Sequence, residues 1–112
     1  VTAIDGNNIY TCLGAEGFKC FGTDGTEKWS FIPKHAVTSS GKVNALCNGC
    51  AYDDQYIYLA YGSLGLIVVD KNTHKEVARR TVARSANYVT VSDGYIFVAY
   101  GQSGLEIFKL AE

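Results

Sequence analysis

The sequence predicts an all-β fold of antiparallel strands, because one phrase made of two apolar runs and a glycine turn occurs three times. The copies are Asn8–Phe21, Tyr56–Val69 and Tyr95–Phe108. Aligned on the turn, which has the pattern G-x-x-G, the glycines are Gly14, Gly62 and Gly101, followed by Gly17, Gly65 and Gly104. Recurring glycines mark turns, and the β-branched and aromatic residues between them favour extended chain.

The middle copy indicates how the strands pack. Both of its strands, 56–61 and 66–69, are apolar at every position, so neither face is suited to water. Strands of this kind are covered on both sides. A repeat of about 40 to 50 residues, built from such antiparallel strands, predicts the blades of a β-propeller. A β-sandwich with chance similarity between its hairpins is the alternative fold.

We expect three blades, at 1–31, 43–82 and 88–110, with the last one incomplete. The first has strands at 1–5, 8–13, 17–21 and 27–31, and Trp29 and Phe31 share a face of the last strand. Residues 32–42 contain the single Pro and form a loop. The second blade has strands at 43–52, 56–61, 65–70 and 76–82, although 76–82 also fits helical spacing. The third has strands at 88–92, 95–100 and 105–110, and its fourth strand is missing.

Length and charge limit the classes of function. The 112 residues amount to one domain, yet a closed propeller takes about four to eight blades. We therefore expect this chain to be part of a larger propeller, with sequence before Val1, since the chain contains no Met. No apolar run reaches the roughly 18 residues of a membrane span. The net charge of −1 gives no reason to expect nucleic acid as the partner.

The sharpest local feature is the C-x-x-C pair formed by Cys47 and Cys50. Such a pair can be a redox disulfide, half of a zinc site, or a structural pair of thiols or a disulfide. Its flanks predict strand rather than the helix N-terminus that activates a redox cysteine. The other cysteines, Cys12 and Cys20, lie too far apart in sequence for the usual second half of a zinc site. The sequence favours a structural pair, and we expect neither a metal nor a cofactor.

Four aspartates occupy one recurring turn, and they are Asp5, Asp53, Asp54 and Asp93. Turn formation explains each of them singly. Together they would stand around one rim, where they could bind a cation or a polar ligand. The G-x-x-G turns precede strands, whereas a phosphate loop precedes a helix. No nucleophile lies beside a base, so we predict no catalytic residues.

Two stretches carry family resemblances. GLIVVD (65–70) and GLEIFK (104–109) resemble the LVIVD repeats of bacterial and archaeal surface proteins. Phe18–Phe31 is similar to a repeat of pyrroloquinoline-quinone-type propellers, also called quinoprotein-like. Both resemblances imply a β-propeller, and members of these families often lie outside the cytoplasm, which here implies the periplasm or the cell surface.

We therefore expect a non-catalytic binding or scaffold module that contacts a protein, peptide or glycan through its blade loops. The alternative is part of a quinoprotein-like or lyase propeller enzyme, whose active site would need blades absent from this chain. A third, structural possibility is association with further blades or with a second copy, because uncovered blade faces would leave apolar surface in water.

Overall fold

The computed structural model describes residues 2–101 and 104–110, which form strands without any helix. The strands are β1 (Thr2–Asp5), β2 (Asn8–Cys12), β3 (Phe18–Gly22), β4 (Glu27–Phe31), β5 (Gly49–Tyr52), β6 (Tyr56–Ala60), β7 (Leu66–Asp70), β8 (Glu76–Arg80), β9 (Ala86–Ser92), β10 (Tyr95–Tyr100) and β11 (Leu105–Phe108). The predicted all-β class is confirmed. Within the described part of the chain, no helix could cross a membrane.

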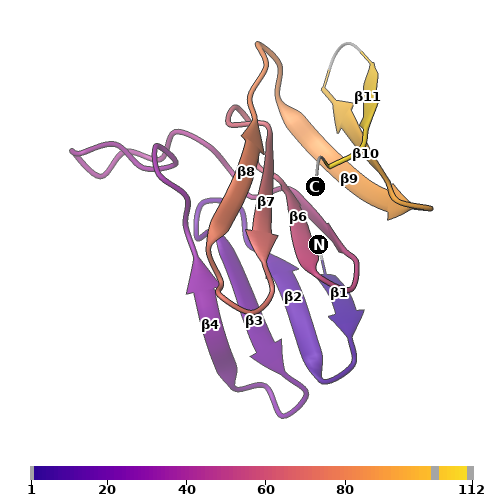
Figure 1. The fold of residues 1–112 in the computed structure, drawn as a ribbon. Coiled ribbons are helices and arrows are strands. Elements are labelled where there is room, and N and C mark those ends of the chain that lie inside the picture. Colours follow the sequence, from indigo (N-terminus) through magenta and orange to yellow (C-terminus); the bar gives the residue numbers. More distant parts are fainter. Residues whose placement is uncertain (1, 102–103, 111–112) are drawn as a thin grey trace.

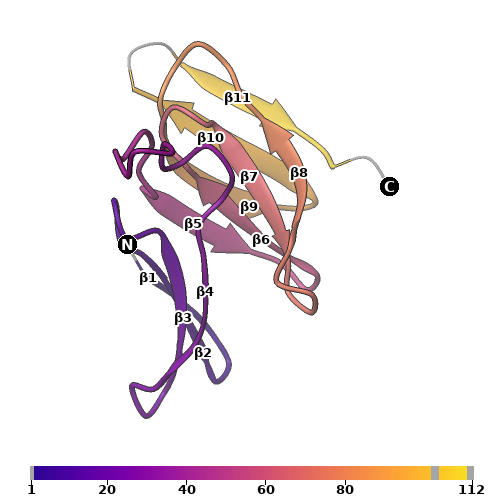
Figure 2. The same cartoon turned by 90° about the vertical axis from the view of Figure 1, so that its left-hand side faces the viewer.

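The strands form three antiparallel sheets, which we call blades 1, 2 and 3. Blade 1 has the order β1-β2-β3-β4, blade 2 the order β5-β6-β7-β8, and blade 3 the order β9-β10-β11. The blades follow one another in space as they do in sequence, with blade 2 between the other two (Figures 1 and 2). The first strand of blade 2, β5, contacts both β1 and β9. Three successive sheets of this kind are propeller blades and not the two layers of a sandwich.

The recurring glycines have the backbone conformation that their turns require. Gly62 and Gly65 both have positive φ, of 55° and 82°, where an L-residue is strained. The Tyr61 amide donates to the Gly65 carbonyl oxygen at 2.8 Å and closes the turn. Leu13 and Gly17 make the same bond in blade 1, at 2.9 Å. These turns fix the register of β2 with β3 and of β6 with β7.

The first glycine of a turn also joins each blade to the next one. Gly14 exchanges two backbone hydrogen bonds with Cys47, both of 3.0 Å. Gly62 does the same with Ala86, at 3.0 and 2.9 Å. Cys47 lies two residues before β5, and Ala86 is the first residue of β9. The repeat therefore specifies the connection between blades as well as the hairpin.

Two apolar cores lie between the blades. Ile57, Leu59, Ile67 and Val69 of blade 2 are fully buried against blade 1. The alternating residues of the same strands, which include Tyr58, Ala60, Leu66 and Val68, are buried against blade 3. Blade 2 is thus covered on both faces, as its uniformly apolar strands predict.

The predicted strand 43–52 is wrong in its first half, because only Gly49–Tyr52 is a strand. The chain before it folds back on the loop instead. Ala36 accepts hydrogen bonds from the amides of Asn44 and Ala45, and Val37 pairs with Val43 in an isolated bridge. The stretch 76–82, which also fits helical spacing, forms a strand at Glu76–Arg80 (β8) that completes the sheet beside β7, and its last two residues lie outside the strand.

Candidate functional site

The four aspartates lie in the turns that join the first two strands of each blade. Asp5 ends β1, Asp53 and Asp54 follow β5, and Asp93 follows β9. Asp93 has a φ of 53° and precedes Gly94 at 81°, as a two-residue hairpin turn requires. The four aspartates therefore lie in equivalent turns of the three blades.

The Asp53 carboxylate is occupied by its own blade. It accepts hydrogen bonds from the amides of Gln55 and Tyr56, at 3.0 and 2.8 Å, and from the hydroxyl of Tyr58. Burial opposes ionisation of this carboxyl, but the three donors outweigh burial and hold its pKa below the ordinary value. Burial and the same hydrogen bond raise the pKa of Tyr58.

Asp5 makes the equivalent contact and also connects two blades. Tyr10 donates to its carboxylate at 2.7 Å, and Lys71 of blade 2 forms an ion pair with it at 2.6 Å. The Lys71 hydrogen bond is the main reason that the pKa of Asp5 is lowered. Lys71 also lies 4.9 Å from the ring centre of Tyr52. Asp5 and Asp53 thus have structural partners, which weakens the ligand-binding interpretation of the rim.

Cys47 and Cys50 meet Cys12 in the core between blades 1 and 2, and all the cysteines are buried free thiols. A hydrogen bond with Cys47 raises the pKa of Cys12, and one with Cys12 together with burial raises the pKa of Cys50. In the pairing of β2 with β3, Cys12 lies opposite Phe18 and Cys20 lies opposite Tyr10. Cys12 and Cys20 therefore share a face of blade 1 but occupy diagonal positions. Raised pKa values keep such thiols protonated and unreactive. Within the described residues, no group of three or more His, Cys, Asp or Glu side chains is placed to hold a metal ion.

The basic residues near β8 divide between its two sides. Arg79 pairs with Glu76 at 2.7 Å and donates to the Lys34 carbonyl oxygen beside blade 1. Arg80 points the other way and pairs with Glu106 of blade 3 at 2.9 Å. They form no continuous basic face.

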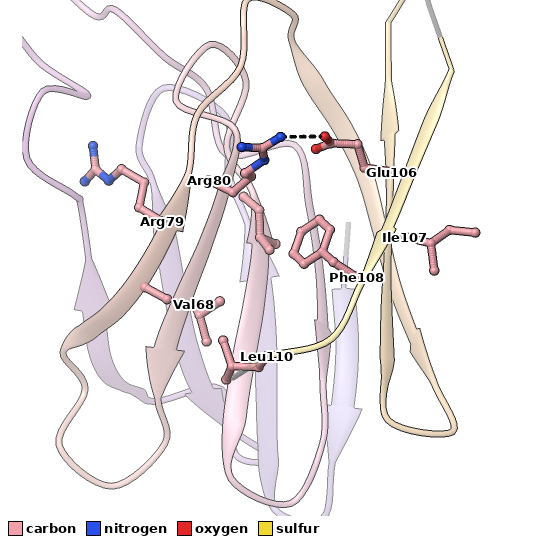
Figure 3. A pocket seen from close by; sticks show the side chains of 9 residues that line it. Val68, Arg79, Arg80, Glu106, Ile107, Phe108 and Leu110 are labelled. Carbon is pink, nitrogen blue, oxygen red and sulfur yellow. Dashed lines mark hydrogen bonds and ion pairs between the residues drawn. The ribbon is translucent and has the colours of Figure 1, made fainter. Parts of the chain in front are cut away.

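The largest departure from the sequence prediction is a groove between blades 2 and 3. It has a volume of about 500 Å³ and runs between the outer strands of blade 2 and β11. Its lining is mainly apolar and consists of Leu66, Val68, Ala78, Arg79, Arg80, Glu106, Ile107, Phe108 and Leu110. Figure 3 shows the Arg80–Glu106 ion pair spanning it, with Phe108 inside and Ile107 pointing away.

The groove lies along an open strand edge. Blades 1 and 2 continue past their third strand to β4 and β8, whereas the described part of blade 3 stops at β11. The Tyr100 amide donates to the Gly104 carbonyl oxygen at 3.0 Å, which makes these two residues a hydrogen-bonded pair. Because such pairs alternate along an antiparallel ladder, Leu105 and Ile107 direct their backbone N–H and C=O groups to the open edge.

Gly104 differs from Gly17 and Gly65 in its surroundings. A Cβ atom on Gly17 would lie 2.9 Å from the carbonyl oxygen of Phe31, and one on Gly65 would lie 2.0 Å from that of Arg80. Phe31 and Arg80 are the last residues of β4 and β8. A Cβ atom on Gly104, which has a φ of 93°, would meet nothing within 4 Å. The third turn therefore keeps room for a strand end that the described part of blade 3 does not supply.

Two features of the sequence indicate this groove, although the sequence analysis placed its candidate binding site at the aspartates. One is the missing fourth strand of blade 3. The other is Glu106, which stands two residues after the second glycine, where blade 2 has the buried Ile67. A charged side chain at a position that is apolar in the middle blade indicates an edge that reaches water.

The comparisons with known proteins concern the fold. No family model matches the chain, and no curated protein matches it either. Among solved structures, the computationally designed Ika4 protein aligns with a TM-score of 0.73 at 10% identity, over 98% of this chain and 64% of that one. The WD40 domain of Neurospora crassa Pan2 aligns with a TM-score of 0.68 at 14% identity, over 97% of this chain and 32% of that one.

These likenesses confirm that the chain folds as antiparallel blades of a β-propeller similar to a WD40 domain. The chain spans less than two thirds of either structure's length. The LVIVD and quinoprotein-like resemblances have no support from family models. At identities this low the likeness extends to the fold alone.

Proposed function

We propose that the chain is a non-catalytic binding module in which blade 3 takes up an extended polypeptide segment as its fourth strand. The observation that supports this proposal is that an apolar groove lies along the open edge of β11. Addition of a strand to a sheet edge is a common mode of peptide recognition, in which main-chain hydrogen bonds supply affinity and side-chain pockets supply specificity.

The complete blades specify the register of such a ligand. In blade 1, Glu27 lies opposite Phe21 and Trp29 opposite Cys20, so Lys28 is an extra, bulged residue. Blade 2 repeats this pattern, with Glu76 opposite Val69 and Ala78 opposite Val68. Both fourth strands therefore begin with Glu followed by a bulge. Phe108 occupies the equivalent place in blade 3, four residues after the second glycine, so the first ligand residue lies opposite Phe108.

Charges along β11 indicate the chemistry of the ligand. The first ligand residue would lie beside Lys109, which favours a carboxylate there. The fourth would lie opposite Glu106, as Arg79 lies opposite Ile67 in blade 2, which favours a basic residue. Opposite charges across a ladder contribute roughly 0.2–1 kcal/mol each. The preferred ligand is thus an extended segment with Glu at its first position, a small or apolar third residue and Arg or Lys at its fourth.

The LVIVD-like stretches favour a location at the cell envelope, and we include an extracytoplasmic site of action in the proposal. A quinoprotein-like or lyase enzyme remains the competing function. It requires turnover of a quinone-linked alcohol, sugar or polysaccharide substrate by a protein that includes the further blades needed for its active site, and such turnover would overturn the non-catalytic assignment.

The peptide test uses an acetylated, amidated octamer with the sequence of residues 75–82, KEVARRTV, which contains the fourth strand of blade 2. Calorimetric titration should show saturable one-to-one binding, and a scrambled octamer should not bind. N-methylation of its Ala nitrogen removes the N–H that faces Ile107 and should weaken binding at least tenfold. N-methylation of the following Arg nitrogen, which faces away from β11, is the matched control and should leave binding within about twofold.

A protein variant tests the same contact from the other side. Ile107→Pro removes an amide hydrogen that no strand of blade 3 uses, so folding should survive while peptide binding is lost. Ile107→Val keeps the amide and should bind as the unchanged chain does. Equal binding by the two variants, or equal effects of the two N-methyl groups, would show that the edge of β11 is not the site.

A further inference from the structure

A cavity between blades 1 and 2, separate from the groove, carries the next inference. It lies beside the turn that joins β1 to β2 and the turn that joins β7 to β8, and its volume is about 460 Å³. That volume is within the range of small-molecule sites, and the lining is mainly polar. Its polar side chains include those of Asp5, Asn8 and Lys28 in blade 1 and those of Lys71, Asn72 and His74 in blade 2.

Two lysine ammonium groups, one from each blade, are held beside each other at this cavity. Asp5 and Asn8 pair across the turn between β1 and β2, so their Cβ atoms lie on one face about 4.5–5.5 Å apart. Lys71 Nζ lies 2.6 Å from Asp5 Oδ2, and Lys28 Nζ donates to Asn8 Oδ1 at 2.6 Å. Each ammonium group is therefore fixed on one of two neighbouring side chains.

The blade repeat does not account for these two lysines. The hydrogen bond between the turn aspartate and a tyrosine recurs in blades 1 and 2 and belongs to the fold. The lysines do not recur, because Lys28 stands where blade 2 has Val77 and Lys71 stands where blade 3 has Leu110. The fold thus explains the aspartate but not the pair of cations beside it, which is specific to this cavity.

The charges that line the cavity leave a small positive excess. With His74 neutral, the ammonium groups of Lys28 and Lys71 give two positive charges, and the Asp5 carboxylate removes one of them. The carboxylate of Asp24 is near enough for its charge to interact with that of Lys28, but it does not line the cavity. A ligand with one negative charge balances the site, whereas a second negative charge would be repelled by Asp5.

The hydrogen bonds within the cavity leave donors for a ligand. The Asp5 carboxylate already accepts from two partners, one of which is Lys71. A lysine ammonium group has three donors, and the contacts above use one on each lysine. The Asn8 amide accepts from Lys28 through its oxygen, so its N–H groups are left for a ligand, and Asn72 adds a second side-chain amide. The site therefore suits a ligand that is rich in acceptor oxygens.

We propose that this cavity binds a small carboxylate that also carries hydroxyl groups. The ligand carboxylate lies between the ammonium groups of Lys28 and Lys71, where charge-assisted hydrogen bonds are strong. The amide N–H groups of Asn8 and Asn72 donate to the hydroxyl oxygens. The proposal is independent of peptide binding, because the edge of β11 belongs to blade 3 and the cavity lies between blades 1 and 2.

Trp29 gives this site an optical signal, because it is the single tryptophan and its ring stacks on His74 at the cavity, with ring centres 3.9 Å apart. The probes are D-gluconate, sorbitol and sorbitol phosphate, which share a hydroxylated carbon chain. Calorimetric titration at low ionic strength should show saturable one-to-one binding of gluconate, with a parallel change in Trp29 fluorescence, and no binding of sorbitol. Sorbitol phosphate carries about two negative charges at neutral pH and should bind at least tenfold more weakly than gluconate.

A pair of lysine variants tests the position of the carboxylate. Lys28→Gln removes one positive charge from an exposed side chain, so urea unfolding should be unchanged while gluconate affinity falls at least tenfold. Lys75→Gln removes the same charge from an exposed residue close to the same turn that does not line the cavity, and should keep the affinity within about twofold. Equal losses in the two variants would indicate unspecific attraction and overturn the proposal. Absence of saturable gluconate binding, equal binding of sorbitol, or tighter binding of sorbitol phosphate would overturn it as well.

Discussion

The carbonyl oxygen of Arg80 lies 2.0 Å from the place that a Cβ atom on Gly65 would occupy. This close approach lets β8 end against the turn between β6 and β7, and a hydrogen on Gly65 is all that the space admits. Because the same approach occurs between Phe31 and Gly17, the second glycine of the repeat serves the fourth strand as well as the turn.

Gly65→Ala should therefore destabilise the fold by more than its backbone conformation alone explains. A left-handed φ costs an L-residue about 1–2 kcal/mol. Gly25, with a φ of 86° and nothing within 4 Å of its Cβ position, is the matched control and should lose only that amount when changed to Ala. Urea unfolding followed by the fluorescence of Trp29 gives both free energies. Equal losses at the two sites would contradict the close packing of Arg80 on Gly65.

Gly104→Ala should behave as Gly25→Ala does in unfolding but should weaken binding of the octamer. Its Cβ atom would meet nothing in the unbound chain, so only the cost of its φ of 93° applies, about 1–2 kcal/mol. In the complex, the same atom would meet the end of the ligand strand, as a Cβ on Gly65 would meet Arg80. Calorimetric titration should show a loss of at least tenfold in affinity, and unchanged affinity would argue against the proposed register.

Asp53→Ala should destabilise the chain, because it leaves the hydroxyl of Tyr58 without its partner. Tyr58 is 3% exposed, and an unsatisfied buried hydroxyl costs about 1–3 kcal/mol. Asp54→Ala, at the neighbouring turn position, is the matched control and should stay within about 0.5 kcal/mol of the unchanged chain. Urea unfolding compares the free energies of unfolding of the two variants. Similar small losses at both positions would show that Asp53 is not structural and would favour the interpretation that the rim binds a ligand.

The same carboxylate predicts a loss of stability in acid. The pKa of Asp53 is lower in the folded chain than its ordinary value of 3.8, and Asp5 and Glu106 are shifted in the same direction. Their contribution is complete above the unfolded pKa values and disappears as the pH falls through the folded ones. The free energy of unfolding should thus decline below about pH 4. Asp53→Asn should make this decline shallower, whereas a variant as steep as the unchanged chain would contradict the shift.

The buried thiols provide a prediction about reactivity and disulfide state. A hydrogen bond with Cys47 raises the pKa of Cys12, and a hydrogen bond with Cys12 together with burial raises the pKa of Cys50. A thiol reagent should therefore react with neither in the folded chain at pH 8. Four thiols should react after denaturation without reductant, because all the cysteines are free. A count of two would instead indicate a disulfide such as the one between Cys47 and Cys50.

Local chemistry explains which parts of the fold the sequence predicts. Apolar residues on both faces of 56–61 and 65–70 specified β6 and β7, and the Glu-led run 27–31 specified β4 at its observed bounds. Residues 43–48 were wrongly predicted as strand because their hydrogen bonds go to the loop at Ala36, a contact that periodicity does not encode. The Asp–Tyr spacing of five residues, in Asp5–Tyr10 and Asp53–Tyr58, was visible but carried no prediction.

The groove depends on tertiary placement and was less predictable. Ala78 and Arg80 come from β8, while Phe108 and Leu110 come from β11 and the residues after it, and no local pattern states that these segments face each other. The sequence predicted only that blade 3 lacks its last strand and that Glu106 departs from the apolar pattern. The four aspartates lie in the turns where the sequence places them, whereas ligand binding by this rim stays a prediction.

Amide hydrogen exchange along β11 tests the central claim most directly. In the unbound chain, the amides of Leu105 and Ile107 should exchange fast and those of Glu106 and Phe108 slowly, since only the latter face β10. Saturation with the octamer should slow Leu105 and Ile107 at least tenfold and leave Glu106 and Phe108 nearly unchanged. Unaltered exchange at Leu105 and Ile107 in a saturated sample would contradict the account, because the ligand would then not be the fourth strand of blade 3.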